Sequence, residues 1–372
     1  MTAPTPRARF IGSEVYRGSS YGPWHPLRIP RVSTVMDLGR ALGWFAPGSY
    51  LNSPRAKPAA LEMWHTPAYV AALRRAEVEG AVPPEVRARH GLGTTANPVF
   101  PEVFRRPATS AGGVMLAAEL VAHGGVVHVP GGGTHHAFPD RAGGFCYLND
   151  PVLCLLTLGR LGLRRLIYLD IDAHHCDGVE HAFAGSEAVR LISVHEERRW
   201  PFTGALEDTA GGAAFNLPVP RDFNDTEMRA VLEGLIVPRI AEWRPDAIVL
   251  QCGADAVAED PLSRLALSNN AHRAVVAALR DLAPRLIVLG GGGYNPWSVA
   301  RLWTGVWGVL AGQEVPDRLP PAAEAVLRAL RWPGARGGRT PPEHWFTTLA
   351  DPPREGPVRP EVRDRLARLA RR

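Results

Sequence analysis

The sequence predicts an α/β fold, a three-layer sandwich in which a mainly parallel central sheet lies between layers of helices. First, short apolar runs rich in β-branched residues alternate with longer helical patterns, an order typical of βαβ units. Second, the 372 residues are 45% hydrophobic and 21% charged, which supplies ample apolar surface for a core. Third, polar or glycine-rich sequence directly follows each apolar run, as it does where parallel strands end at a ligand site.

The individual elements are predicted from the periodicity of the apolar residues. Short continuous apolar runs predict strands at residues 126–129, 166–171, 189–194, 247–251 and 286–289. The segments between them predict helices at 113–123, 152–161, 226–243, 270–282 and 298–310. Residues 1–110 are richer in Pro, Gly and aromatic residues and contain one clear helix near 67–79. We interpret this first part as loops and helices that decorate the sheet.

The domain organisation is predicted to be a single α/β domain over residues 1–372, with a core at about 10–312. After about residue 312 the chain becomes rich in Pro and Arg, so 313–372 is expected to be a peripheral extension that covers an edge or trails away. The last stretch, RPEVRDRLARLARR, is basic and is interpreted as a solvated amphipathic helix or a frayed tail.

Composition also excludes several classes of function. The net charge is +5, and no stretch has the basic stripe with interleaved aromatic residues that nucleic-acid binding needs. The longest apolar runs are far below the roughly 18 residues that span a bilayer, and MTAPTPRARFIG contains no secretory signal. The four cysteines form no C-x-x-C pair. We therefore expect a cytoplasmic protein without nucleic-acid or membrane partners, with a homo-oligomer left open.

The segment YLDIDAHHCD provides a candidate metal site. Side chains alternate along a strand, so Asp170, Asp172 and His174 can point the same way as the strand ends. Asp255, which follows the strand at 247–251, is the best further ligand. A mixed oxygen and nitrogen donor set suits Zn²⁺, and Fe²⁺ or Mn²⁺ is also compatible with it.

Two adjacent histidines, His135 and His136, follow the glycine-rich turn PGGG. They are either a second set of metal ligands or a general acid–base pair. The acid–base role is better supported if three metal ligands lie elsewhere. Each histidine then needs a carboxylate to orient it, and Asp170 and Asp177 are close in the sequence to the metal segment.

The last candidate is Tyr294, which follows four consecutive glycines. The GGGGYN segment lacks the spacing of a phosphate-binding loop. A flexible pivot could instead place the tyrosine over the crevice, where its hydroxyl group would donate a hydrogen bond to an oxyanion.

These segments, in this order, resemble the histone deacetylase superfamily, and most closely its bacterial acetoin-utilization-type branch. The resemblance runs from about Tyr21 to Trp303 and rests on the motifs YGPWHPLRIPR, GLGTTANPVF, GGGTHHAF, GGFCYLND, YLDIDAHHCDGVEHAF, QCGADAVAEDPL and GGGGYN. It implies the arginase/deacetylase α/β fold and zinc-dependent hydrolysis of an N-acyl amide. The substrate would be acetyl-lysine or a small acylated amine.

The resemblance also implies roles for individual residues. The zinc ligands would be Asp172, His174 and Asp255; His135 would pair with Asp170 and His136 with Asp177; and Tyr294 would stabilise the transition state. Gly144, Phe145, Trp200 and Leu262 would line the substrate tunnel, and Arg31 would stand beside an internal channel for the acetate product. A structural K⁺ or Na⁺ would be bound by Asp170, Asp172, His174, Ser193 and Val194, largely through main-chain oxygens.

Two positions depart from the pattern of this family. Ala96 stands where protein deacetylases carry an aspartate that grips the peptide backbone, and Leu262 stands where polyamine-selective relatives carry a glutamate. Three alternatives remain beside a lysine-type deacetylase: an acetylpolyamine amidohydrolase, a two-metal ureohydrolase, and a catalytically silent binding or regulatory protein. The single D-x-H motif argues against two metals, and the complete catalytic set argues against a silent protein.

Overall fold

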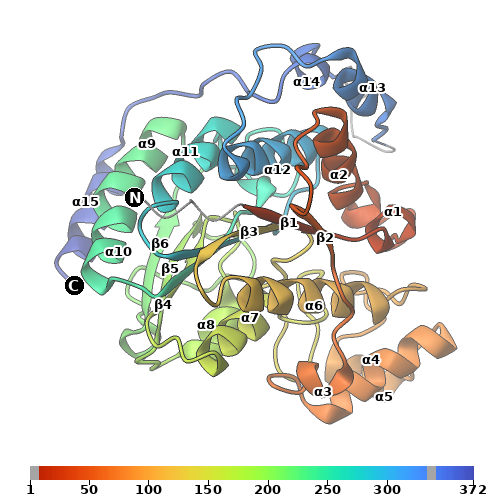
Figure 1. Cartoon of the computed structure of the whole chain (residues 1–372). Coiled ribbons are helices and arrows are strands. Elements are labelled where there is room, and N and C mark those ends of the chain that lie inside the picture. The colour runs from red at the N-terminus through yellow and green to blue at the C-terminus, as the bar shows by residue number, and fades with distance from the viewer. Residues whose placement is uncertain (1–7, 333–340) are drawn as a thin grey trace.

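The computed structural model describes residues 8–332 and 341–372, which form an eight-stranded sheet between layers of helices (Figure 1). The strand order is β2-β1-β3-β8-β7-β4-β5-β6, and every neighbouring pair is parallel. The strands are β1 (Arg9–Gly12), β2 (Tyr50–Asn52), β3 (Gly125–Val129), β4 (Leu166–Asp170), β5 (Val189–Glu196), β6 (Ala214–Val219), β7 (Ala247–Gln251) and β8 (Arg285–Leu289). The predicted fold class is confirmed.

The five predicted strands are β3, β4, β5, β7 and β8, which occupy the middle of the sheet. Their apolar runs are nearly continuous because both faces of these strands are buried. The expectation that residues 1–110 only decorate the sheet is wrong, because β1 and β2 form one of its edges. These two strands are three or four residues long, too short to show a periodic pattern.

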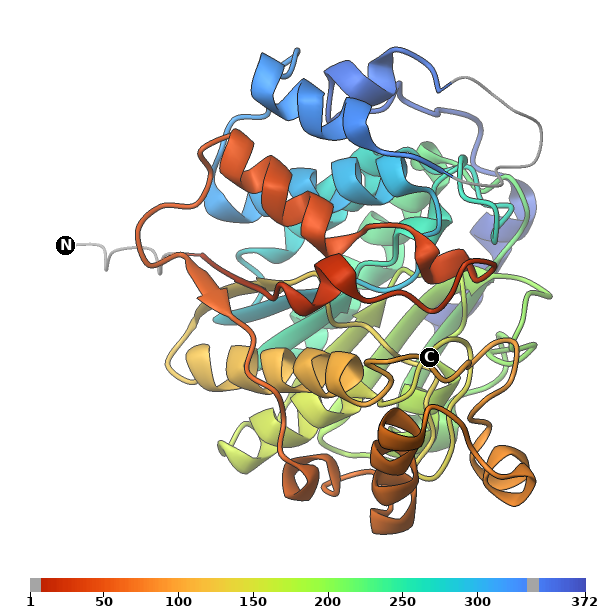
Figure 2. The same cartoon turned by 90° about the vertical axis from the view of Figure 1, so that its right-hand side faces the viewer.

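Helices cover both faces of the sheet (Figures 1 and 2). One face carries α6 (Arg105–Leu120), α7 (Asp150–Arg160) and α8 (Asp177–Phe183). The other carries α1 (Val15–Gly18), α2 (Val32–Ala41), α9 (Asp225–Val231), η3 (Leu232–Ile236), α10 (Val237–Trp243), α11 (Asn269–Leu279), α12 (Pro296–Ala311), α13 (Pro321–Ala329), α14 (His344–Thr347) and α15 (Pro360–Ala370). A third cluster holds α3 (Pro58–Leu61), α4 (Pro67–Glu79) and α5 (Pro84–His90) beyond α6. The short helical turns are η1 (Pro26–Arg28), η2 (Ala210–Gly212) and η4 (Ala254–Ala256).

The C-terminal extension packs against the sheet edge. Its last helix, α15, buries Val362 and Leu369 completely, so of the two interpretations of this stretch the amphipathic helix is confirmed and the frayed tail is wrong. The guanidinium of Arg365 donates a 2.7 Å hydrogen bond to the carbonyl oxygen of Pro218 on the edge strand β6. The helices α13 and α14 of the extension lie against α2 and α12 (Figure 1).

The parallel sheet determines where chemistry can occur. The carboxyl ends of β3, β4, β7 and β8 lie side by side, so the polar segments that follow these strands meet at one edge of the sheet. Among the described residues, no helix has the length and apolar character needed to cross a membrane.

Candidate active site

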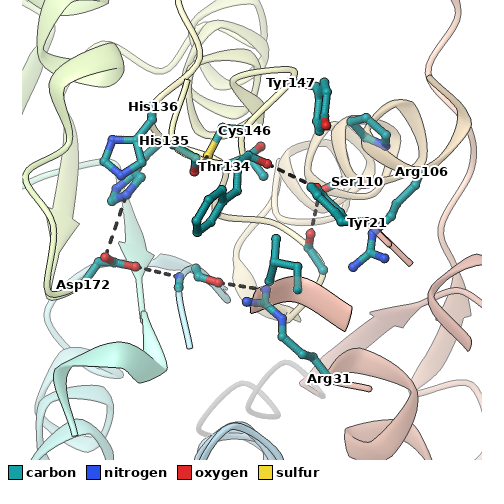
Figure 3. Close-up of a pocket in the computed structure, with 18 of the residues that line it drawn as sticks. Tyr21, Arg31, Arg106, Ser110, Thr134, His135, His136, Cys146, Tyr147 and Asp172 are labelled. Carbon is teal, nitrogen blue, oxygen red and sulfur yellow. Dashed lines mark hydrogen bonds and ion pairs between the residues drawn. The ribbon is translucent and has the colours of Figure 1, made fainter. Parts of the chain in front are cut away.

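A cavity of about 60 Å³ lies at this edge, and three of the predicted polar segments contribute to its lining. His135 and His136 come from the loop after β3, Asp172 and His174 from the loop after β4, and Tyr294 from the loop after β8. Figure 3 shows the two histidines side by side above Asp172.

Asp172, His174 and Asp255 form the candidate metal centre. One ligand atom from each lies within 4.8 Å of the others, and His174 Nδ1 is 3.2 Å from Asp172 Oδ1 and 2.9 Å from Asp255 Oδ2. The backbone packs tightly around them: a Cβ atom at Gly292 would lie 2.0 Å from Asp255 Oδ2. Only glycine at this position therefore allows the loop after β8 to close over the two carboxylates.

The electrostatics of these three residues fit a cation. Both carboxylates are fully buried, where negative charge needs compensation. Burial and the charge of Asp172 raise the pKa of Asp255. Burial opposes charge on His174, but hydrogen bonds to Asp172 and Asp255 outweigh it and raise its pKa to about 10. Two carboxylates and one imidazole in a buried site are ligands that Zn²⁺, Fe²⁺ or Mn²⁺ accepts.

The adjacent histidines each contact a different carboxylate. His135 Nδ1 is 2.8 Å from Asp170 Oδ2, and His136 Nδ1 is 2.7 Å from Asp177 Oδ1. Burial disfavours charge on both rings. The charges of Asp170 and Asp172 outweigh burial for His135 and raise its pKa to about 9. Burial and the neighbouring His135 lower the pKa of His136 to about 4, so His136 is the ring that is neutral near pH 7.

A further carboxylate, Asp150, holds the loop that carries the two histidines, and the sequence analysis missed it. Its oxygens accept hydrogen bonds from the Gly133 N–H at 2.7 Å and from the Ser110 and Thr134 hydroxyls at 2.6 Å each. Gln251 adds a 2.8 Å bond to the Gly133 carbonyl oxygen. The signal was present in GGFCYLND, because this aspartate begins α7 beside the loop and is fully buried.

Tyr294 also lines the cavity. Its N–H donates a 2.6 Å hydrogen bond to Asp260, and its ring packs edge-on against Phe145 with 5.7 Å between ring centres. Burial, together with the charge of Asp255, raises the pKa of Tyr294 well above its usual value. The hydroxyl group therefore stays protonated and can donate a hydrogen bond.

The predicted tunnel walls are brought together. The Trp200 and His136 rings are 4.6 Å apart, edge to face, and a Cβ atom at Gly144 would lie 2.4 Å from the Trp200 ring. Leu262 packs in the same apolar cluster as Phe145 and Tyr294. Ala96 is exposed, and its carbonyl oxygen is 3.2 Å from His25 Nε2.

The end of the cavity away from the histidines contains two arginines, of which only Arg31 was predicted. Arg31 donates hydrogen bonds to the carbonyl oxygens of Gly291, at 2.9 Å, and Gly293, at 3.1 Å. Arg106 lies over the Tyr16 and Tyr21 rings, and Figure 3 shows both guanidinium groups at the end away from the histidines. No motif signal marked Arg106, which lies in the first turn of α6.

The residues of the expected monovalent-cation site are neighbours in the sheet. Ser193 of β5 is opposite Asp170 of β4, and Val194 follows it. The Ser193 hydroxyl group is 2.9 Å from His195 Nδ1. The assignment of a cation to these residues stays a prediction.

Comparisons with known proteins agree with this geometry. Residues 25–310 match the model of the histone deacetylase domain. The acetoin utilization protein AcuC of Bacillus subtilis is 32% identical over 325 residues, which cover 82% of this chain and 84% of that protein. Histone deacetylase 9 of Arabidopsis thaliana is 34% identical over 313 residues, which cover 82% of this chain and 73% of that protein.

A solved structure of a histone deacetylase homologue from Aquifex aeolicus aligns with a TM-score of 0.92 and 35% identity, over 98% of this chain and all of that one. A structure of a histone deacetylase homologue complexed with SAHA aligns equally well. The match to the domain model covers most of the chain, and the relatives share more than 30% of their residues with it. The chain belongs to the histone deacetylase family.

Proposed function

We propose that this protein is a metal-dependent hydrolase that cleaves N-acetyl and similar N-acyl amides into a carboxylate and a free amine. The observation that carries the proposal is the convergence of a neutral histidine, His136, with a candidate metal centre and a protonated tyrosine on one cavity. Membership of a family whose members are named deacetylases supports the same reaction class. The substrates we propose are small acylated amines or acyl-lysine.

Asp172, His174 and Asp255 would hold the metal, for which we propose Zn²⁺, with Fe²⁺ or Mn²⁺ as substitutes. When bound, such an ion supplies Lewis acidity that polarises an acyl carbonyl group and makes a water molecule more acidic. The donor set supports this assignment because it joins two buried carboxylates to an imidazole.

The chain's own residues would supply the proton transfers. His136 is neutral near pH 7 and is therefore able to accept a proton from water as the acyl carbon is attacked. Asp177 fixes the Nδ1 side of this ring and so exposes Nε2 to the cavity. His135, which is protonated near pH 7, is suited to donate a proton to the leaving amine. Tyr294 would donate a hydrogen bond to the oxyanion that develops on the acyl oxygen.

The remaining residues would bind and release the reactants. Phe145, Gly144 and Trp200 would surround the chain that carries the acyl amine and exclude water from it, with Leu262 behind Phe145. Arg31 would attract the carboxylate product toward the end of the cavity away from the histidines. A K⁺ or Na⁺ ion at Asp170, Asp172, His174, Ser193 and Val194 would have a structural role.

An acetylpolyamine amidohydrolase is the alternative within the same chemistry. It is less well supported because Leu262 and Ala96 offer no carboxylate to a second amine. A two-metal hydrolase is also less well supported, since the described residues contain one group of ligands rather than two.

The test combines metal analysis with hydrolysis of a panel of acetylated lysines, peptides, polyamines and small amines. We expect one divalent ion per chain and hydrolysis of at least one acetamide. Asp172→Ala and His174→Ala should lose the ion and the activity together, because each removes one of three protein donors. The exposed Asp208→Ala serves as the matched control. Retention of a tightly bound ion by both variants would contradict the assignment.

A further inference from the structure

A second cavity, with a volume of about 740 Å³, lies where α3, α4 and the start of α6 meet, beyond α6 as seen from the sheet (Figure 1). It shares no lining residue with the candidate active site. Its volume is within the range of roughly 300–1,000 Å³ that small-molecule sites occupy. Four cationic side chains line it: Arg55, Lys57, Arg74 and Arg75. We call this cavity the basic pocket.

The four cationic side chains of the basic pocket have no counter-charge. All four residues are exposed, and their side chains make no hydrogen bond, ion pair or ring contact with the described part of the chain. Elsewhere on the surface, Arg17 and Arg40 each contact the same two carboxylates, Glu14 and Asp37. Because like charges repel each other, a cluster of unpaired cations attracts an anion from solution.

The one acidic residue that lines the basic pocket already has another role. The Glu77 carboxylate accepts hydrogen bonds from the N–H groups of Phe104, at 2.9 Å, and Arg105, at 2.7 Å. These donors lie at the start of α6, where no side chain of the helix itself caps the free N–H groups. Glu77 therefore caps α6 and leaves the four cations unpaired.

One wall of the pocket is the segment before α3, and α6 holds its backbone in place. The Ala56 N–H donates a 2.8 Å hydrogen bond to the carbonyl oxygen of Ala108 in α6. A Cβ atom at Gly112 would overlap the carbonyl oxygen of Pro54, so this segment lies directly on the helix. The positions that carry the cationic residues 55 and 57 are therefore set by a buried helix.

The other wall is one face of α4. Ala71, Arg74, Arg75 and Val78 have the spacing that places side chains on the same side of a helix, and all four line the pocket. This face is exposed along its whole length. The small side chain of Ala71 leaves room beside the two arginines, so a ligand can lie between α4 and the segment before α3.

The charge pattern favours a compact phosphate-bearing ligand. A guanidinium group is a planar fork that binds two oxygens of one phosphate group, and three such forks with one ammonium group can neutralise several negative charges. Exposed carboxylates limit the basic surface, since Glu62 directly follows α3 and Glu79 ends α4. A long polyanion such as a nucleic acid would extend over these carboxylates, whereas a compact anion would contact the cations alone.

We infer that the basic pocket binds a compact anion with two or more phosphate groups, at a site separate from that of the proposed amide hydrolysis. The phosphate groups would lie between Arg55 and Lys57 on one side and Arg74 and Arg75 on the other. This chemistry is common to free polyphosphate and to the phosphate chain of a nucleotide.

The chain provides its own local probe, because Lys57 is its only lysine. Reductive methylation of the full chain labels this one side-chain amine, and the α-amino group is the internal reference. ATP or inorganic triphosphate, at roughly ten times its Kd, should slow the methylation of Lys57 about tenfold relative to the α-amino group. AMP at the same concentration should change this rate less than about twofold, because it offers one phosphate group.

Equilibrium binding of ATP at physiological salt gives a second measurement. Arg55→Gln and Arg74→Gln should each weaken the binding about tenfold, because each removes a charged donor. The matched control is Arg89→Gln, which removes an exposed arginine of α5 outside the pocket and should leave Kd unchanged. Unchanged metal content in all variants separates this site from phosphate bound at the candidate metal centre.

Equal Kd values for ATP in the wild type, Arg55→Gln and Arg74→Gln would overturn the inference. Equal slowing of Lys57 methylation by AMP and ATP would also overturn it. Tighter binding of single-stranded oligothymidylate than of ATP would show a nucleic-acid surface in place of a compact site. Equal binding of ATP and triphosphate would support recognition of the phosphate chain alone, and tighter binding of ATP would support the nucleotide as the source of that chain.

Discussion

Asp177 holds His136 through a single contact of 2.7 Å between its Oδ1 and the Nδ1 atom of the ring. In the same loop, His135 makes the corresponding contact with Asp170, but its surroundings favour the charged ring. Two adjacent histidines thus have opposite protonation states near pH 7. In the proposed reaction this difference would separate the proton acceptor, His136, from the proton donor, His135. The role of the carboxylate behind His136 can therefore be tested by itself.

We predict that Asp177→Asn lowers kcat about 10²- to 10⁴-fold while the metal content stays unchanged. An amide in place of the carboxylate favours the tautomer whose proton is on Nε2, and that ring cannot accept a proton from water. The matched control is Glu180→Gln, because Glu180 also pairs with a histidine and lies 3.2 Å from His175 Nε2. Steady-state kinetics gives kcat, and metal analysis gives the metal content of each variant. Equal kcat values in the wild type and Asp177→Asn would exclude the orienting role.

Tyr294→Phe should keep the fold and the metal but lose about 10²- to 10³-fold in kcat. The reason is that the hydroxyl group would stabilise charge that exists only in the transition state. Phenylalanine preserves the ring contact with Phe145, so the cavity wall should persist. A raised KM with an unchanged kcat would show that the tyrosine only lines the cavity, and a loss of thermal stability would point to a packing role.

Ala96→Asp should improve turnover of acetyl-lysine peptides selectively, by about tenfold or more in kcat/KM. Ala96 is exposed beside His25, so a carboxylate there could accept hydrogen bonds from a peptide backbone without entering the core. A small acetylated amine makes no such contacts and should be unaffected. The assay compares one peptide with one small amine. If the wild type already prefers the peptide tenfold and the substitution changes nothing, another residue grips the backbone.

His128 should make the free energy of unfolding depend on pH. It lies in β3 with no exposed surface, and burial lowers its pKa to about 4, below the usual value of 6.5. Between pH 6.5 and 4 the unfolded chain therefore binds the extra proton, so the free energy of unfolding falls as the pH falls through this window.

We expect that His128→Leu lowers the number of protons taken up on unfolding by about one. The measurement is the free energy of unfolding in urea at pH 7 and pH 4.5. The exposed His123→Leu is the control and should leave the slope unchanged. The same slope in the wild type and His128→Leu would mean that His128 is not the group responsible. His65 has a pKa lowered to about 4 by burial, so part of the slope should persist in either variant.

The sequence was sufficient to predict the elements that have a strong periodic signal. It was insufficient to predict those that depend on contacts with distant segments. The middle strands were predicted because their buried runs are apolar on both faces. Strand β6 was missed because Asn216 and Pro218 interrupt its pattern, which an edge strand tolerates. The grouping of polar side chains at the strand ends was predicted because parallel strands bring their carboxyl ends together.

Supporting residues were harder to predict because their roles depend on tertiary contacts. Asp150 acts through a loop 16 positions earlier in the sequence, with Thr134 as one partner. Arg106 lines the cavity with its guanidinium group over the Tyr21 ring. Neither residue has a local signature, since a buried carboxylate or arginine is recognised only when its surroundings are known.

The contact between Arg365 and Pro218 has a consequence for association between molecules. An exposed edge strand presents unpaired backbone groups that can recruit a strand from another chain and begin aggregation. On β6, Pro218 has no N–H to offer, and its carbonyl oxygen is already bonded to Arg365 of α15. The C-terminal helix therefore blocks lateral growth of the sheet at this edge, so its removal should promote edge-to-edge polymerisation at high protein concentration.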